Sequence, residues 1–193
     1  MSRFSFCLSS TVSALLSFSS AGLDAADWPC YQGDAARSSV TDERLSFPLR
    51  ETWVHKPSKP PRPAWPEPAR ELHRIDFDYA FQPVAAGGLV YFGSSADDTL
   101  HALDAATGKV RWRFTAEGPI RFAPHIEGGR CYFASDDGWV YCLDSDTGRH
   151  QWRFRVAPND RQIVGDGRVI SRWPCRSGVL VSDGTAYVIA GMW

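Results

Sequence analysis

The side chains best suited to bind a ligand are gathered in one arginine-rich segment, Arg155–Arg176. It contains five arginines and two aspartates. Guanidinium groups bind carboxylates and phosphates through paired hydrogen bonds, and a tryptophan can stack on a sugar or a peptide. The candidate ligand-contacting residues are Arg161, Arg168, Arg172, Trp173 and Arg176. The alternative is a packed loop in which the arginines pair with neighbouring acids.

Acidic and imidazole side chains elsewhere do not form a catalytic or metal-binding pattern. The adjacent carboxylates of Asp97-Asp98 and Asp136-Asp137 suit a hard cation such as Ca²⁺, but further oxygen ligands at fixed spacing are missing. We therefore interpret both pairs as solvated turn residues. His101, His125 and His150 lack the spacing of metal ligands. The sequence predicts no catalytic residue and no metal ligand.

These residues are embedded in a repeat of about 40 residues. Gly88–Phe114 aligns with Gly129–Phe154, and a third copy begins at Gly178. Each copy alternates short apolar runs with turns, and no helical 3.6-residue period is present. This pattern predicts four-stranded antiparallel blades of a β-propeller. We expect an all-β, incomplete propeller with about two full blades and parts of others.

Both complete copies share an Asp-x-x-Thr-Gly turn that is followed by a tryptophan. The aspartate can accept amide hydrogens of its own turn, and the glycine can adopt a positive φ. We expect the tryptophan to pack face-on against the next blade and to donate its N–H to a carbonyl there. The structural repeat motif consists of Ala102, Asp104, Gly108, Trp112, Asp144, Gly148 and Trp152.

The chain divides into three predicted parts. Residues 1–26, with a basic start and an apolar run, are typical of a secretory signal peptide. Residues 27–80 form a lead-in with a closing strand and a Pro-rich loop, and residues 81–193 form the propeller repeats. We expect the blades at about 81–115, 122–155 and 177–193, the last being truncated.

Individual strands can be placed from the apolar runs. In the first blade we expect strands at Leu89–Gly93, Thr99–Leu103 and Lys109–Phe114, and in the lead-in a short strand at Glu51–His55. The segment Lys56–Arg70 is rich in proline. We interpret it as a stiff surface loop, with a docking peptide for an aromatic groove as the alternative.

Two cysteines of the second repeat, Cys131 and Cys142, flank one turn. Counting outward from that turn places them nearly opposite each other, which leaves a cross-strand disulfide open. The first repeat has Val90 and Ala102 at the same positions. The sequence therefore favours two small buried thiols.

The overall charge and the predicted signal peptide limit location and partners. A net charge of −1 gives no global attraction to nucleic acid. No segment is typical of a membrane span. We expect a periplasmic or secreted protein that binds a protein or a polymeric ligand at one face of the propeller.

The motif Ala102-x-Asp104-x-x-x-Gly108-x-x-x-Trp112 resembles the tryptophan-docking repeat of pyrroloquinoline-quinone (PQQ) propellers. In the second copy Cys142 replaces the alanine. That family includes quinoprotein alcohol dehydrogenases and proteins without a cofactor, among them the BamB-type scaffold. The stretch Ala80–Trp193 also resembles large secreted PQQ-like repeat proteins of planctomycete-type bacteria. The sequence Asp27-Trp28-Pro29, followed by Gly33 and Arg37, is similar to the start of mature proteins in that group. The resemblance implies that the N-terminal strand completes the last blade and that Trp53 is the outer tryptophan of that blade.

The resemblance also implies what a quinoprotein should contain: a vicinal Cys-Cys pair, a catalytic Asp, and Glu and Asn ligands for calcium. The sequence has no Cys-Cys pair, and Asn159 is its single asparagine. We therefore expect a non-catalytic binding or assembly scaffold without a cofactor. The alternatives are the N-terminal part of a PQQ- and Ca²⁺-dependent alcohol or sugar dehydrogenase and a non-functional truncated product. Two blades and part of a third cannot close a ring, so we expect a fragment, or self-assembly if the chain is complete.

Overall fold

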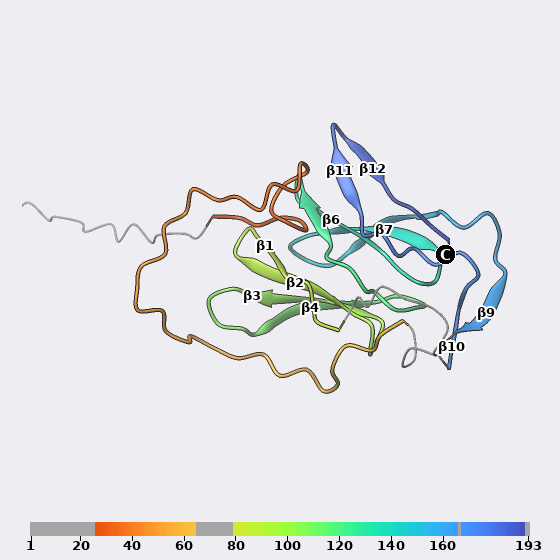
Figure 1. Cartoon of the computed structure of the whole chain (residues 1–193), viewed down its shortest axis with the longest axis horizontal. Coiled ribbons are helices and arrows are strands. Elements are labelled where there is room, and N and C mark those ends of the chain that lie inside the picture. Colours follow the sequence, from red (N-terminus) through yellow and green to blue (C-terminus); the bar gives the residue numbers. More distant parts are fainter. Residues whose placement is uncertain (1–25, 65–78, 166, 192–193) are drawn as a thin grey trace, which may run out of the picture.

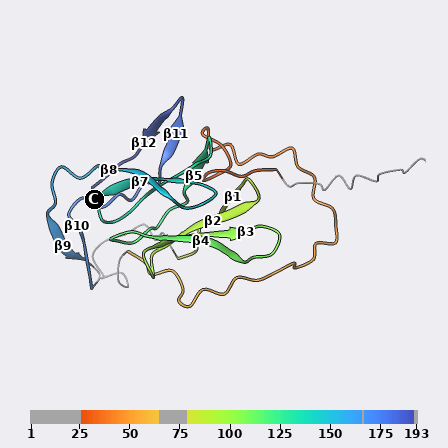
Figure 2. The same ribbon diagram turned by 180° about the vertical axis from the view of Figure 1, so that it is seen from behind.

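The computed structural model describes residues 26–64, 79–165 and 167–191, and all regular elements in these ranges are β-strands. The predicted signal peptide lies outside the described residues except for Ala26, and so does the second half of the Pro-rich segment. Figures 1 and 2 show two twisted sheets lying side by side, with a long lead-in running around them. The predicted all-β, partial propeller is confirmed.

Each complete repeat forms one four-stranded antiparallel sheet. In the first blade the strands are β1 (Val84–Ala86), β2 (Leu89–Ser94), β3 (Thr99–Asp104) and β4 (Val110–Thr115), and they pair in chain order. In the second blade they are β5 (His125–Glu127), β6 (Arg130–Ala134), β7 (Trp139–Asp144) and β8 (His150–Arg155), again in chain order.

Two hairpins follow the second blade. β9 (Gln162–Gly165) and β10 (Arg168–Ser171) pair within the arginine-rich segment, and β11 (Leu180–Ser182) pairs with β12 (Thr185–Tyr187) at the start of the third repeat. The central part of the arginine-rich segment is therefore a regular β-hairpin. Its Asp166-Gly167 dipeptide between two apolar runs is a strong hairpin signal.

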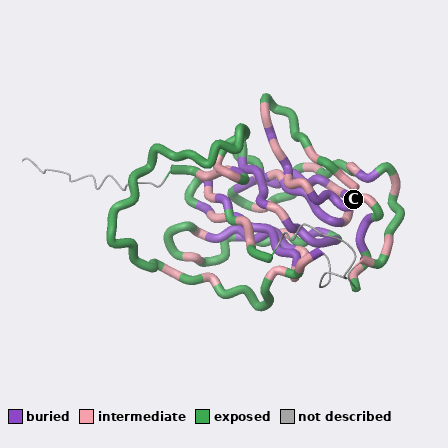
Figure 3. Tube along the Cα trace, in the orientation of Figure 1, coloured by how far each residue is buried: buried purple, intermediate pink, exposed green. Residues whose placement is uncertain are grey.

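The core of the molecule lies between the two blades. Tyr91 and Ala102 of the first blade and Phe133 and Leu143 of the second are almost completely buried in one cluster. Ile120 lies so close to the first blade that a Cβ on Gly93 would be 2.4 Å from its Cγ2 atom. In Figure 3 burial is concentrated in the two sheets, whereas residues 34–52 of the lead-in are exposed.

The two Asp-x-x-Thr-Gly turns have the same geometry. Asp104 Oδ1 accepts hydrogen bonds from the backbone N–H and the hydroxyl of Thr107 at 2.9 and 2.8 Å. Asp144 Oδ1 accepts the equivalent bonds from Thr147 at 2.9 and 2.6 Å. These bonds lower the pKa of both aspartates. The glycine that ends the first turn, Gly108, has a φ of 68°.

The tryptophan of the first blade rests on the turn of the second. The Trp112 Nε1–H donates to the Ser145 carbonyl at 2.8 Å, and the side chain is 8% exposed. A Cβ on Gly148 would lie 2.6 Å from the indole ring, so only glycine allows this close approach. The contact joins the two blades at the end where the β3–β4 and β7–β8 turns lie.

Trp53 of the lead-in makes the same contact on the first blade. Its Nε1–H donates to the Ala105 carbonyl at 2.8 Å, and a Cβ on Gly108 would lie 2.6 Å from its ring. The predicted strand at Glu51–His55 is wrong, because these residues join no sheet in the described structure. The segment nevertheless packs on the first blade in the same way as β4 packs on the second blade.

The four cysteines in the described ranges are free and buried. Cys131 pairs with Leu143, whereas Cys142 pairs with Tyr132. The expectation that the two cysteines lie opposite each other is therefore wrong by one residue. Because neighbouring residues of a strand point to opposite faces, the two thiols lie on different faces of the blade. This geometry does not suit a disulfide.

Replacing the buried tryptophan with alanine should destabilise the protein far more than replacing its counterpart in the second blade. We expect Trp112→Ala to reduce the free energy of unfolding by about 3–5 kcal/mol, because it removes a large buried ring and leaves a cavity. Trp152→Ala, at a half-buried position, should cost clearly less. Urea denaturation of both variants measures the difference, and equal losses would contradict the proposed packing role.

The junction between the second and third repeats should weaken in acid. His125 Nδ1 accepts the Val181 N–H at 3.2 Å, and burial lowers the pKa of His125 below its ordinary 6.5. The unfolded chain therefore binds this proton more readily, so the histidine's contribution to stability is complete above about pH 6.5 and decreases below it.

The measurement is the urea midpoint at pH 7.5 and at pH 5.5. His125→Gln should show a smaller loss between the two values than the unchanged protein. His150→Gln, at an exposed position, serves as the control and should keep the original pH dependence. Identical pH dependence in all three proteins would contradict the assignment.

Candidate functional site

The arginine-rich segment lies at the end of the blades opposite to the tryptophan contacts. We call this end the loop face and define it by residues 95–98, 116–123, 135–138 and 156–178. Figure 1 shows the β9–β10 hairpin at this end of the two sheets. Backbone hydrogen bonds attach it there: the Ser171 N–H donates to the Asp136 carbonyl at 2.9 Å, and the Cys175 N–H donates to the Ser135 carbonyl at 3.2 Å.

A buried carboxylate between two arginines forms the centre of the loop face. Asp136 is 0% exposed and accepts from Arg121 Nε at 2.7 Å. Arg176 binds the same carboxylate with two nitrogens, at 3.0 and 2.9 Å. Arg121 also donates to the Arg62 carbonyl at 2.7 Å. The interpretation of Asp136 as a solvated turn residue is therefore wrong, because its carboxylate is completely buried and ion-paired with two buried arginines.

A second ion pair connects the β9–β10 hairpin to the first blade. Arg168 pairs with the Asp98 carboxylate and donates to the Ser95 carbonyl at 2.8 Å. Burial raises the pKa of Asp98, while the Arg168 guanidinium beside it acts in the opposite direction. The pair spans the two blades, so it fixes the position of the hairpin.

The remaining candidate residues are more accessible. Arg161 and Arg172 are exposed, and their backbones are joined by the bond from the Arg172 N–H to the Arg161 carbonyl at 2.9 Å. The Arg172 guanidinium lies 5.5 Å from the centre of the half-buried Trp173 ring. The structure thus engages Arg168 and Arg176 with carboxylates and leaves Arg161, Arg172 and Trp173 at the surface.

Next to these residues, a second aromatic side chain is covered by arginines. Arg153 and Arg155 lie 4.3 and 4.8 Å from the Trp139 ring centre, a distance that allows cation–π attraction. Arg153 also pairs with Glu117 at 3.1 Å. A hollow of about 140 Å³ between β8 and β9 is lined by Trp139, Arg155 and Arg161. The sequence analysis did not identify Trp139, because its partners Arg153 and Arg155 belong to β8 and meet it only when the strands pair.

The other adjacent carboxylates serve the fold. Asp137 accepts the Tyr141 hydroxyl at 2.6 Å and the Trp139 N–H at 2.9 Å, and burial raises its pKa. Asp97 lies 3.2 Å from His101 Nε2. Among the described residues, no three His, Cys, Asp or Glu side chains gather in a way that could hold a metal ion.

Six of the seven residues of the structural repeat motif lie at the opposite end of the blades from the loop face. The seventh, Ala102, lies in the core. Asp104 and Asp144 stabilise the two turns, Gly108 and Gly148 support an indole ring, and Trp112 is buried between the blades. Trp152 differs from Trp112, because it is half-buried and its Nε1 has no hydrogen-bond partner among the described residues.

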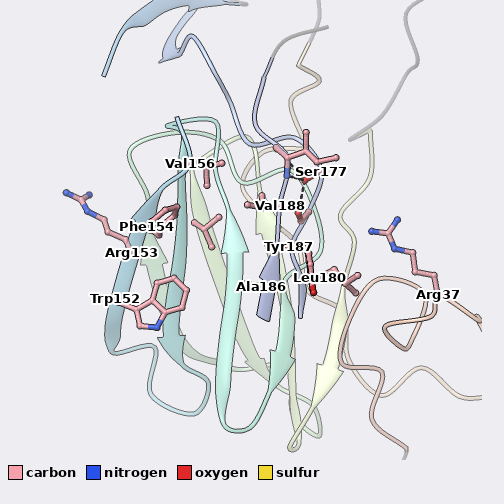
Figure 4. A pocket seen from close by; sticks show the side chains of 13 residues that line it. Arg37, Trp152, Arg153, Phe154, Val156, Ser177, Leu180, Ala186, Tyr187 and Val188 are labelled. Atoms are coloured by element: carbon pink, nitrogen blue, oxygen red, sulfur yellow. Dashed lines mark hydrogen bonds between the residues drawn. The ribbon is translucent and has the colours of Figure 1, made fainter. Parts of the chain in front are cut away.

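An apolar hollow of about 940 Å³ lies beside Trp152, between β8 and the β11–β12 hairpin (Figure 4). Phe154, Val156 and Leu180 are among the side chains that line it. The Tyr132 and Trp152 rings are 6.0 Å apart, close to the 5.8 Å between Tyr91 and Trp112. The first blade has an equivalent surface around Trp112, and there the second blade covers it. On the second blade the equivalent surface, around Trp152, forms this hollow. We interpret it as a blade-packing surface.

Comparison with models of known protein families identifies the family to which the chain belongs. A family model described as outer membrane protein assembly factor BamB matches residues 50–189. The chain therefore belongs to the PQQ-like repeat β-propeller family. A comparison with curated proteins finds no match.

The chain is also similar to solved structures at low sequence identity. Quinohemoprotein alcohol dehydrogenase from Comamonas testosteroni is 16% identical, with a TM-score of 0.54 over 84% of this chain and 27% of the other. Alcohol dehydrogenase ADHIIG from Pseudomonas putida HK5 is 17% identical, with a TM-score of 0.48 over 61% and 18%. BamB from Moraxella catarrhalis is 21% identical, with a TM-score of 0.36 over 54% and 40%. The chain thus spans at most 40% of the length of these structures.

The residues described here do not fit a quinone and calcium site. The loop-face carboxylates Asp98 and Asp136 are bound by arginines, and Asp137 is bound by a tyrosine hydroxyl and backbone N–H groups. Asn159, the single asparagine, uses its side-chain oxygen to accept the Arg161 N–H at 3.1 Å. We assign no chemical step to a quinone in this chain. The described residues also contain no helix long and apolar enough to cross a membrane.

Removing the buried carboxylate should unfold much of the loop face. We expect Asp136→Ala to reduce the free energy of unfolding by about 3–5 kcal/mol, because it removes the buried carboxylate that two buried guanidinium groups bind. Asp160→Ala, at an exposed position on the same face, should have an effect close to zero. Chemical denaturation compares the two variants, and an Asp136→Ala loss below about 1 kcal/mol would contradict the assigned role.

Proposed function

We propose that this chain is part of a periplasmic or secreted, non-catalytic propeller that binds another protein through its loop face. The family description, which names an outer membrane protein assembly factor, supports both the compartment and the kind of partner. The engagement of the loop-face carboxylates in ion pairs and hydrogen bonds supports a binding role over a catalytic one.

The observation that carries the proposal is the rigid attachment of the arginine-rich segment. The pair Arg168–Asp98 fixes the β9–β10 hairpin to the first blade, and the pair Arg176–Asp136 fixes the end of the segment to the second blade. The exposed Arg161 and Arg172 are thereby presented on a support that is already ordered. Preorganised side chains lose less conformational entropy on binding, so such a surface is well suited to recognition.

The chemistry of this surface favours an acidic protein segment. Arginine and tryptophan are enriched at binding hot spots, and here Arg172 lies over Trp173 while Arg155 lies over Trp139. A carboxylate side chain of a partner can accept paired hydrogen bonds from Arg161 or Arg172. An apolar neighbour on the partner can contact the indole rings.

Reversing the charge of the exposed arginines should abolish partner binding. The experiment places a photoreactive side chain at Gln162 and quantifies cross-linked proteins from the extracytoplasmic fraction by mass spectrometry. We expect Arg161→Glu/Arg172→Glu to reduce the main cross-linked protein at least tenfold, because charge complementarity is replaced by repulsion.

The matched control makes the same charge change at the opposite end of the blades. Lys109→Glu/Arg149→Glu alters two exposed cations near the Asp-x-x-Thr-Gly turns and should leave cross-linking unchanged. Equal losses in both double variants would indicate non-specific electrostatics. Full cross-linking by the Arg161→Glu/Arg172→Glu protein would refute the proposed surface.

A further inference from the structure

A separate hollow lies beside the first blade. It is lined by Ala96 and Asp97 of the loop face, but not by Arg161, Arg172 or Trp173. It has a volume of about 530 Å³ and lies between residues 55–59 of the lead-in and the outer strands β3 and β4. This volume is in the range of small-molecule sites, about 300–1,000 Å³. The part of the lead-in that borders it is held by Trp53, which is hydrogen-bonded to the first blade.

The second blade shows why this hollow exists. Thr99 pairs with Thr115 in the first blade, and Trp139 pairs with Arg155 at the same position of the second. In the second blade the Trp139 ring, covered by Arg153 and Arg155, fills most of the space, and a hollow of about 140 Å³ remains. Two threonines in place of a tryptophan and an arginine thus leave the first blade open at this point.

The second blade also indicates that the hollow stays accessible. The first blade is complete and packs against the second. The small hollow beside Trp139 of the second blade is nevertheless open to the protein surface. Within the part of the chain that the structure describes, Glu117, which follows β4, is the only residue from the first blade's side that lines it. A blade packed before the first one would therefore leave the larger hollow open.

Its walls combine positive charge with hydroxyl groups. Lys56, Lys59 and Arg113 are exposed cations that line the hollow, and Asp97 is the only carboxylate among the described residues that line it. The Asp97 carboxylate lies 3.2 Å from His101 Nε2, so one of its oxygens already has a partner within the protein. The cations therefore outnumber the acids, unlike in the smaller hollow, where three arginines face three acidic side chains.

The floor of the hollow is aromatic and contains an unused polar atom. The Phe92 ring stacks on His101 with 4.9 Å between the ring centres, and Phe81 lies 5.0 Å from Phe92. His101 is 7% exposed, and its buried Nδ1 atom has no hydrogen-bond partner among the residues that the structure describes. Buried polar atoms of native proteins are usually satisfied, so this nitrogen indicates a missing partner.

We propose that the hollow binds a small organic anion. Its carboxylate or phosphate group contacts Lys56, Lys59 and Arg113, and its flat apolar part lies against Phe81 and Phe92. Lining of apolar and aromatic surface with a few converging polar groups is typical of small-molecule sites. The site shares no lining residue with Arg161, Arg172 and Trp173, the exposed side chains proposed above to contact a partner protein.

The test uses the full chain and four probes: phenyl phosphate, phthalate, inorganic phosphate and benzyl alcohol. Isothermal titration calorimetry should show binding of phenyl phosphate or phthalate at millimolar or lower concentration, and the tighter of the two identifies the anionic group. Inorganic phosphate and benzyl alcohol should bind at least tenfold more weakly, because each lacks one half of the contacts. If inorganic phosphate bound as well as phenyl phosphate, the aromatic part of the proposal would be wrong.

Two variants and one control locate the binding. Thr99→Trp copies the second blade and should reduce affinity at least tenfold by filling the hollow. Arg113→Gln, at an exposed position, should reduce affinity about tenfold without affecting folding. Arg153→Gln makes the same change in the second blade and should bind like the unchanged protein. The proposal fails if none of the four probes binds, or if Arg113→Gln binds as tightly as the Arg153→Gln control.

Discussion

The contact between an indole ring and the turn of the next blade is the interaction on which the rest of this structure depends. A single blade buries little apolar surface and becomes stable only when it is covered by its neighbour. Trp112 makes that contact through a hydrogen bond to Ser145 and a close approach to Gly148. Trp53 repeats it on the first blade, although its own segment belongs to no sheet. The same contact thus holds a strand of a blade and an irregular segment equally well.

The two ends of the blades are stabilised by different chemistry. At the end with the Asp-x-x-Thr-Gly turns, the contacts between blades are made by indole rings, glycines and backbone carbonyls. At the loop face, the contacts are made by arginines and aspartates, with the Asp136 carboxylate completely buried. Because buried charges require defined partners, this end fixes the orientation of the inserted hairpin. The exposed arginines of the hairpin gain a stable position as a result.

The sequence predicted the features that depend on local pattern. The repeat, the strands around it and the turn chemistry of Asp104 and Asp144 can be seen in consecutive residues, and the fold class follows from them. The ion pairs of the loop face could not be predicted, because Asp136 and Arg176 meet only after the insertion folds back over the second blade. The cysteine register was wrong because β6 and β7 pair Ala134 with Val140, one residue further along β7 than a symmetric turn would give.

The tryptophan contact also has a direction. Each blade offers an indole ring on one side and receives one on its other side, so a blade cannot be turned around without losing both contacts. A copy of one repeat inserted between two neighbours would find a matching surface on each side. Tandem duplication of a single unit can therefore lengthen such a protein without the need for a new interface. The Asp-x-x-Thr-Gly turn and the tryptophan that follows it are the minimal set that such a duplication must preserve.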